Sequence, residues 1–114
     1  MSLDKGSVRL RHMLEHAREA VDMASGKGRA DLDRDRKLNL ALVRLLEIIG
    51  EAAGRMSPEE CANYPDIPWH EIVSLRNRLI HGYDSVDFDI LWQIVKNDLP
   101  PLIDQLMMIL SSDK

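Results

Sequence analysis

The stretch LNLALVRLLEIIGEAAGRM, residues 38–56, repeats its apolar side chains with the period of an α-helix. A wide apolar face is formed by Leu38, Ala41, Leu42, Leu45, Ile48, Ile49, Ala52 and Met56. Arg44, Glu47, Glu51 and Arg55 fall on the opposite side, where acids and bases one turn apart can pair. We therefore predict a long amphipathic helix, capped at its start by Asp31 or Asp33.

Before this helix, residues 4–24 carry a second apolar stripe at helical spacing. The glycine-containing segment 25–28 lacks the Gly-Lys-Ser/Thr of a phosphate loop, so it is interpreted as a turn between two helices. After the long helix, residues 57–60 read Ser-Pro-Glu-Glu, a capping box with proline at the first helical position. A short helix is therefore expected to begin there.

The second half of the chain predicts three more helices. Trp69 opens one of them after the rigid connector at residues 64–68. Asp87 can cap the next, and Pro100 and Pro101 can interrupt it and begin the last. Strand signals are absent, so we expect an all-α, up-down bundle of five to six helices forming a single domain over residues 1–114.

Composition restricts the function classes. The single cysteine, Cys61, excludes an internal disulfide framework and a Cys-rich zinc site, and we expect no metal and no cofactor. No apolar run reaches membrane-spanning length and no signal peptide is evident, so a soluble, cytoplasmic protein is expected. Residues 1–50 hold ten Lys/Arg against eight Asp/Glu, and residues 51–114 hold five against eleven. This balance favours a local phosphate site over a long nucleic-acid track.

Residues 76–83, RNRLIHGY, contain the candidate site. On a regular helix, Arg76 falls inside the apolar arc of Ile72, Leu75, Leu79 and Ile80. A guanidinium left unpaired in an apolar interior is costly, so Arg76 must be paired internally or face a cleft that binds an anion. Gly82 is a helix terminator, which would place His81 at the helix C-terminus, one turn after Asn77.

These residues, with the segments around them, resemble the HepT-like branch of the HEPN superfamily. The likeness covers roughly residues 3 to 110. Arg76, Asn77, His81 and Tyr83 fit the family pattern of Arg followed by a polar residue, His after four intervening residues, and Tyr after one more. The matching flanking blocks are LEIIGEA at 46–52, PDIPW at 65–69, DSVD at 84–87 and LPPL at 99–102.

The resemblance implies a HEPN-like helical fold, a homodimer with two motifs lining one cleft, and an RNA substrate. It also implies a nucleotidyltransferase antitoxin as partner, which transfers AMP from ATP to Tyr83. Glu51 is included among the supporting residues because its Gly-Glu-Ala block is part of the likeness. Such a chain would be the toxin of a toxin–antitoxin system.

The residue types suit RNA cleavage without a metal. Histidine can transfer a proton near neutral pH, so His81 is assigned to proton transfer. The planar guanidinium of Arg76 can bind two phosphate oxygens and stabilise the charge that develops there. Asn77 would orient His81 or a phosphate oxygen. The product would carry a 2′,3′-cyclic phosphate.

Three alternatives stay open. Arg76 could form a structural ion pair with Glu51 or with an acid of another helix. On a regular helix Arg76 and His81 point about 140° apart, so either the helix loosens before Gly82 or a second subunit completes the site. The chain could also be a non-catalytic subunit that binds a nucleotide or a nucleotidyltransferase. Self-association would cover the apolar residues 106–110 of the last helix.

Overall fold

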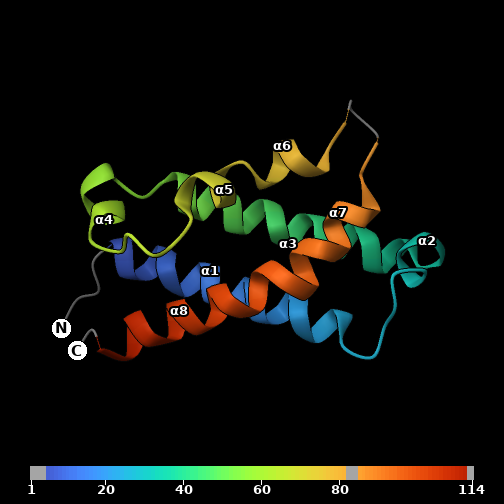
Figure 1. Ribbon diagram of the computed structural model, residues 1–114, viewed down its shortest axis with the longest axis horizontal. Coiled ribbons are helices and arrows are strands. Elements are labelled where there is room, and N and C mark those ends of the chain that lie inside the picture. The colour runs from blue at the N-terminus through green and yellow to red at the C-terminus, as the bar shows by residue number, and fades with distance from the viewer. Residues whose placement is uncertain (1–4, 82–84, 113–114) are drawn as a thin grey trace.

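The structure is a computed structural model that describes residues 5–81 and 85–112. Its described elements are α1 (Lys5–Ala24), α2 (Asp31–Arg34), α3 (Arg36–Gly54), α4 (Pro58–Ala62), α5 (Trp69–Val73), α6 (Leu75–Leu79), α7 (Phe88–Gln93), a π-helical turn η1 (Ile94–Asp98) and α8 (Leu99–Ser112). The two long helices α1 and α3 run antiparallel, α5 and α6 run along one side of α3, and α8 packs against α1 (Figure 1). The predicted all-α, up-down fold is therefore confirmed.

Aliphatic side chains from these helices fill the core. Fully buried examples are Leu10 and Met13 of α1, Leu42, Leu46 and Ile49 of α3, Leu79 of α6, and Leu91, Ile94 and Leu106 of the C-terminal segment. Within the described residues the only β pairing is an isolated bridge between Ile80 and Val86. Among the described helices, none combines the length and apolar character needed to cross a bilayer.

The start of the long central helix differs from the prediction. Neither Asp31 nor Asp33 caps α3, because both lie in the separate short helix α2. The extended backbone angles of Asp35 interrupt the helical geometry between α2 and α3. Its carboxylate accepts a hydrogen bond from the N–H of Leu38 at 3.1 Å. The expected cap was therefore placed too early by two or four residues.

Two other predicted helix starts are confirmed. Ser57 and Glu60 form the reciprocal capping box of α4, with Pro58 at its first position. Asp87 caps α7 by accepting from the N–H of Ile90 at 3.1 Å. Pro100 and Pro101 lie in the first turn of α8, so the prediction that they begin the last helix is confirmed. Because they lack N–H groups, the carbonyls of Lys96 and Asn97 lose their usual helical donors, and the chain forms the π-helical turn η1 before α8.

The predicted motif helix is broken. Where the sequence suggested one helix from Trp69 to His81, the structure has α5 and α6, separated at Ser74. The hydroxyl of Ser74 donates back to the carbonyl of His70, a contact that competes with regular helix geometry. This break and the one at Asp35 give the described chain more helical segments than the five to six expected.

Candidate functional site

Arg76 lies on the surface of α6. Its side chain is 67% exposed, and its Nε lies 3.3 Å from Oε2 of Glu47 on α3. Its predicted position inside an apolar arc is wrong, because the break at Ser74 removes Ile72 from the arc and leaves Leu75 and Leu79 as the buried face of α6. The alternative of an ion pair with another helix is what the structure shows, with Glu47 rather than Glu51 as partner.

A surface hollow of about 270 Å³ lies beside this ion pair, where α5 and α6 cross α3. It is lined by Glu47, Gly50, Glu51, Gly54, Val73 and Arg76. The structure thus brings the predicted supporting residue Glu51 to the same hollow as Arg76. The Glu51 carboxylate itself is directed to Arg44, at 3.5 Å, and Arg44 also lies 3.7 Å from Glu47.

Glycines on α3 shape this hollow. A Cβ on Gly50 would lie 3.1 Å from the carbonyl oxygen of Ile72, so the missing side chain lets the backbone of α5 approach. A Cβ on Gly54 would meet only the Cγ1 of Val73, at an ordinary 3.9 Å. Gly50 is therefore the position that fixes how closely the motif segment lies against α3.

His81 lies beyond the end of the motif helix. Because α6 ends at Leu79, the predicted helix C-terminal position of His81 is wrong, and its i, i+4 relation to Asn77 is lost. The N–H of His81 instead donates to the carbonyl of Ser85 at 2.7 Å, and the N–H of Asp87 donates to the carbonyl of Leu79 at 2.8 Å. On a regular helix Arg76 and His81 would point apart, and either an early helix end or a second subunit was expected to resolve this. The structure shows the early end, because α6 stops at Leu79, before Gly82.

Asp87 is a site residue to which the sequence assigned only the role of a helix cap. Its Oδ2 lies 3.9 Å from Nε2 of His81, which is an ion-pair distance when the imidazole is protonated. Its Oδ1 simultaneously caps α7 through the N–H of Ile90. One carboxylate therefore lies between the histidine and the start of the next helix. Its signals in the sequence were the capping position and its place in the DSVD block at 84–87.

The remaining predicted residues have different outcomes. Asn77 is exposed on α6. Gly82 and Tyr83 lie outside the described residues, so the proposed AMP acceptor is not placed. Arg78 is half-buried and lies 3.6 Å from Asp98. Burial, with a smaller contribution from Glu60, raises the pKa of the half-buried Cys61 thiol, which fits a structural filler rather than a nucleophile.

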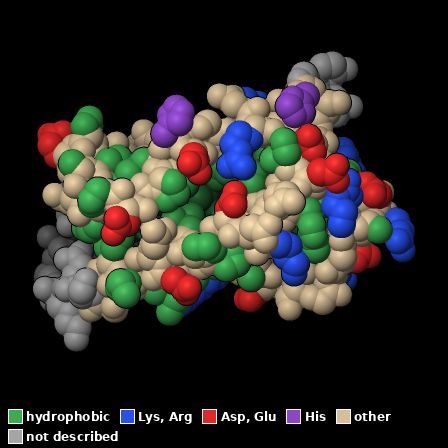
Figure 2. Space-filling view, viewed as in Figure 1, with side chains coloured by type: hydrophobic (Ala, Val, Ile, Leu, Met, Phe, Trp, Pro, Cys, Tyr) green, Lys and Arg blue, Asp and Glu red, His purple; other side chains and the backbone are tan. Residues whose placement is uncertain are grey.

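Arg76 and His81 are both available to solvent, with side chains 67% and 61% exposed. Among the described contacts each has its own carboxylate partner, Glu47 for the arginine and Asp87 for the histidine. Figure 2 shows histidine side chains projecting from the edge of the molecule where α5 and α6 lie. The chain thus presents two exposed side chains, an arginine and a histidine five residues apart, each within 4 Å of a carboxylate.

The family model of the ribonuclease HepT-like proteins matches residues 13–109, which include every described site residue. The chain belongs to the HepT-like ribonuclease family. The resemblance to the HepT-like branch of the HEPN superfamily is therefore confirmed.

Several curated HepT-like relatives are similar over most of their length. A candidate RNase of Methanocaldococcus jannaschii is 33% identical over 97 residues, 85% of this chain and 89% of that protein. A candidate RNase of Caldanaerobacter subterraneus is 34% identical, covering 92% and 94% of the two chains. A candidate ribonuclease HepT of Thermococcus cleftensis is 39% identical over 93 residues, 78% of this chain and 84% of the relative. No solved structure gives a significant match.

Proposed function

We propose that this HepT-like protein is the toxin of a toxin–antitoxin pair and acts as a metal-independent endoribonuclease through Arg76 and His81. The observation that carries the proposal is the exposed edge on which both side chains are accessible while Glu47 and Asp87 hold them in place. Family membership supports the RNA substrate class. A site formed only for structural pairing would have no need of an exposed histidine beyond the helix end.

In the proposed reaction, His81 takes the proton of the 2′-hydroxyl as its oxygen attacks the adjacent phosphorus. The bond from phosphorus to the 5′-oxygen breaks as that oxygen takes a proton from a water molecule, and a 2′,3′-cyclic phosphate forms. Asp87 stabilises the imidazolium that results from the first proton transfer, since its carboxylate faces Nε2 at 3.9 Å. The hydroxide left by the water then takes the proton from His81. Asn77 would orient a phosphate oxygen.

A phosphate that binds Nε and one terminal nitrogen of Arg76 must displace Glu47, which contacts Nε. Exposed ion pairs contribute only about 0–1 kcal/mol, so the exchange costs little. A phosphate can then accept two parallel N–H bonds from the planar guanidinium. Glu47 therefore acts as a placeholder that keeps Arg76 oriented toward the hollow when no RNA is bound.

We infer a homodimer from exposed apolar side chains on α3 and α5. Val73 of α5 is 48% exposed and lines the hollow with Arg76, and Leu40 of α3 is 51% exposed. In the last helix, where residues 106–110 are all apolar, Leu106 is buried while Met107 and Met108 are exposed. We propose that the α3–α5 face, rather than α8, forms the dimer contact and sets two motifs along one cleft.

The proposed neutralising partner is a nucleotidyltransferase antitoxin that transfers AMP from ATP to the Tyr83 hydroxyl. The added phosphate would bring negative charge into the chain segment that carries Arg76 and His81. Incubation with the partner and ATP should increase the intact mass of the wild type by one adenylate and leave Tyr83→Phe unchanged. Wild type that stays unmodified under conditions where the partner is active would reject this part of the proposal.

Single-turnover cleavage of RNA by variants tests the catalytic assignment. We expect His81→Ala to lose cleavage and keep RNA binding, because the lost group transfers a proton. Arg76→Lys should lose most activity, since an ammonium cannot reproduce a bidentate contact. If wild type binds RNA without cutting it, and its Tyr83 is unmodified, the chain is the non-catalytic binding subunit instead.

A further inference from the structure

A second surface hollow, of about 380 Å³, lies between α1 and α3. Arg9, His12 and Arg55 supply its basic groups, Val8 and Ile48 its apolar lining, and Glu51 its single acid. Glu51 also lines the hollow that contains Arg76. The two hollows therefore adjoin on the surface of α3, on either side of one residue.

The acid in this second hollow is already engaged. A Glu51–Arg55 pair across one turn was expected from the sequence, but Glu51 lies 3.5 Å from Arg44 instead. No described acid forms an ion pair with the guanidinium of Arg55, and this residue is exposed. Arg9, His12 and Arg55 thus share this hollow with a single lining carboxylate. That carboxylate, of Glu51, already pairs with Arg44.

Of the other two basic side chains, that of Arg9 is anchored in place. Arg9 donates from NH1 to the carbonyl oxygen of Arg55 at 2.7 Å and lies 3.9 Å from Glu60. The backbone carbonyl oxygen of His12 accepts a hydrogen bond from Nδ1 of His16, 2.6 Å away. The imidazole ring of His12 takes no part in that bond. Such a basic hollow, with charge and donors fixed by neighbouring backbone, suits the oxygens of a phosphate group.

We propose that the α1–α3 hollow binds a backbone phosphate of the RNA, outside the bond that is cleaved, with Arg55 as the principal contact. The inference rests on the proposed ribonuclease function and extends it with a second phosphate site. An RNA strand would cross Glu51 between the two hollows, with one phosphate at Arg76 and another at Arg55. The mildly acidic protein would then hold its substrate at two local sites.

Fluorescence anisotropy with a labelled, fully 2′-O-methylated RNA oligonucleotide tests this site without cleavage. We expect Arg55→Gln to weaken binding roughly three- to tenfold, and to reduce the slope of log affinity against log salt by about 0.7, the value for one phosphate contact on a single strand. Arg55→Lys should restore most of the affinity. Arg55→Gln should not unfold the protein, because Arg9 bonds to the backbone oxygen of residue 55 rather than to its side chain.

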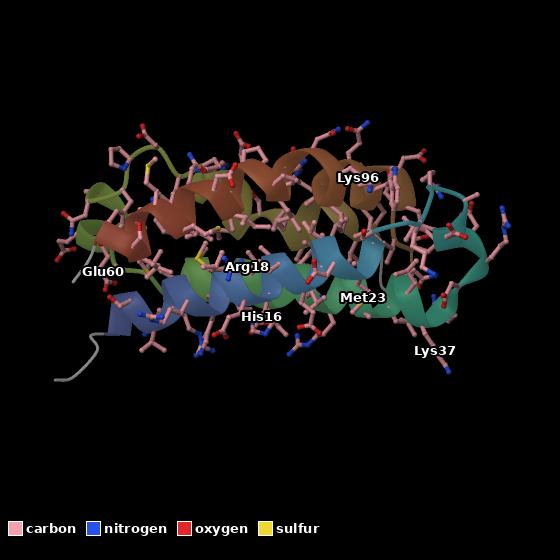
Figure 3. All side chains as sticks on the ribbon, turned by 90° about the horizontal axis from the view of Figure 1, so that it is seen from below. His16, Arg18, Met23, Lys37, Glu60 and Lys96 are labelled. Atoms are coloured by element: carbon pink, nitrogen blue, oxygen red, sulfur yellow. The ribbon has the colours of Figure 1, made fainter. Side chains whose placement is uncertain are left out.

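Arg18→Gln is the matched control, since Arg18 is an exposed arginine of α1 (Figure 3) that does not line the hollow. It should leave affinity and salt slope unchanged. Arg76→Gln separates the two proposals. If Arg76→Gln weakens binding and Arg55→Gln does not, the second site is wrong and the ribonuclease proposal stands. If ATP, but not the RNA, loses affinity in Arg55→Gln, the hollow is a nucleotide site and the RNA inference is overturned.

Discussion

The two proposed catalytic side chains each meet a carboxylate, and the two carboxylates have different roles. Glu47 pairs with Nε of Arg76, the proposed phosphate-binding group, whereas Asp87 lies 3.9 Å from His81, the proposed proton-transfer group. Glu47 is the more enclosed of the two acids, with 20% of its side chain exposed, and it is shared with Arg44. We therefore expect opposite effects from replacing each acid by its amide: a gain in RNA binding for Glu47 and a loss of cleavage for Asp87.

Glu47→Gln should strengthen RNA binding. The substitution removes the ion that competes with phosphate for Arg76, and an exposed pair of this kind is worth up to about 1 kcal/mol. We therefore expect RNA affinity to rise about two- to fivefold. Glu59→Gln, which removes the same charge from the exposed surface of α4, should change affinity much less. Equal effects of both variants would assign the gain to net charge rather than to Arg76.

Asp87→Asn should slow cleavage while keeping the fold. Asparagine caps helices as well as aspartate does, so α7 keeps its cap, but the charge facing His81 is lost. We expect kcat to fall about two- to fivefold, the loss of up to about 1 kcal/mol from one exposed charge pair, with little change in KM or in melting temperature. Asp87→Ala should add a loss of about 1 kcal/mol of stability. A kcat unchanged in Asp87→Asn would remove this residue from the site.

At the scale of elements, the break between α5 and α6 determines the site. Apolar periodicity correctly located α1, α3 and the helix start at Trp69, because these depend on residues close in sequence. It failed at Ser74 and at residues 80–81. At Ser74 the hydroxyl donates back to the carbonyl of His70, and at residues 80–81 the backbone is set by contacts with residues 85–87, such as the bond between His81 and Ser85. Glu47 as the partner of Arg76 was unpredictable for the same reason, since 29 residues separate them.

Alanine at the two α3 glycines should separate close packing from helix propensity. Gly50→Ala places a Cβ 3.1 Å from the Ile72 carbonyl, so α5 must shift, and we expect lower thermal stability and reduced cleavage. Gly54→Ala meets only a side-chain methyl at 3.9 Å and should melt at or above the wild-type temperature, since alanine favours helix by up to about 1 kcal/mol. Differential scanning calorimetry compares them. A stabilised, fully active Gly50→Ala would show that the approach of α5 is not critical.

For the whole molecule, the question is which apolar surface a second copy covers. Exposed apolar side chains occur at the α3–α5 face, with Leu40 and Val73, and on α8, with Met107 and Met108. The first face adjoins the hollow that contains Arg76, whereas the methionines lie on another helix. An assembly through the first face would enclose the site, and one through α8 would not.

Val73→Asp and Met108→Asp distinguish these surfaces. Light scattering at micromolar concentration should give a dimer for wild type and for Met108→Asp, and a monomer for Val73→Asp, because a buried unpaired carboxylate at the interface is costly. We expect the monomeric variant to lose cleavage as well. A monomeric wild type would refute the shared cleft, and a monomer produced only by Met108→Asp would move the interface to α8.

The most direct measurement is the cleavage of mixed cellular RNA in the presence of EDTA. Wild type whose intact mass shows an unmodified Tyr83 is compared with His81→Ala. We predict that the wild type alone cuts the RNA and leaves 2′,3′-cyclic phosphate ends. Equal cleavage by both proteins, or none by the unmodified wild type, would contradict the assignment of His81 to proton transfer in a metal-independent ribonuclease.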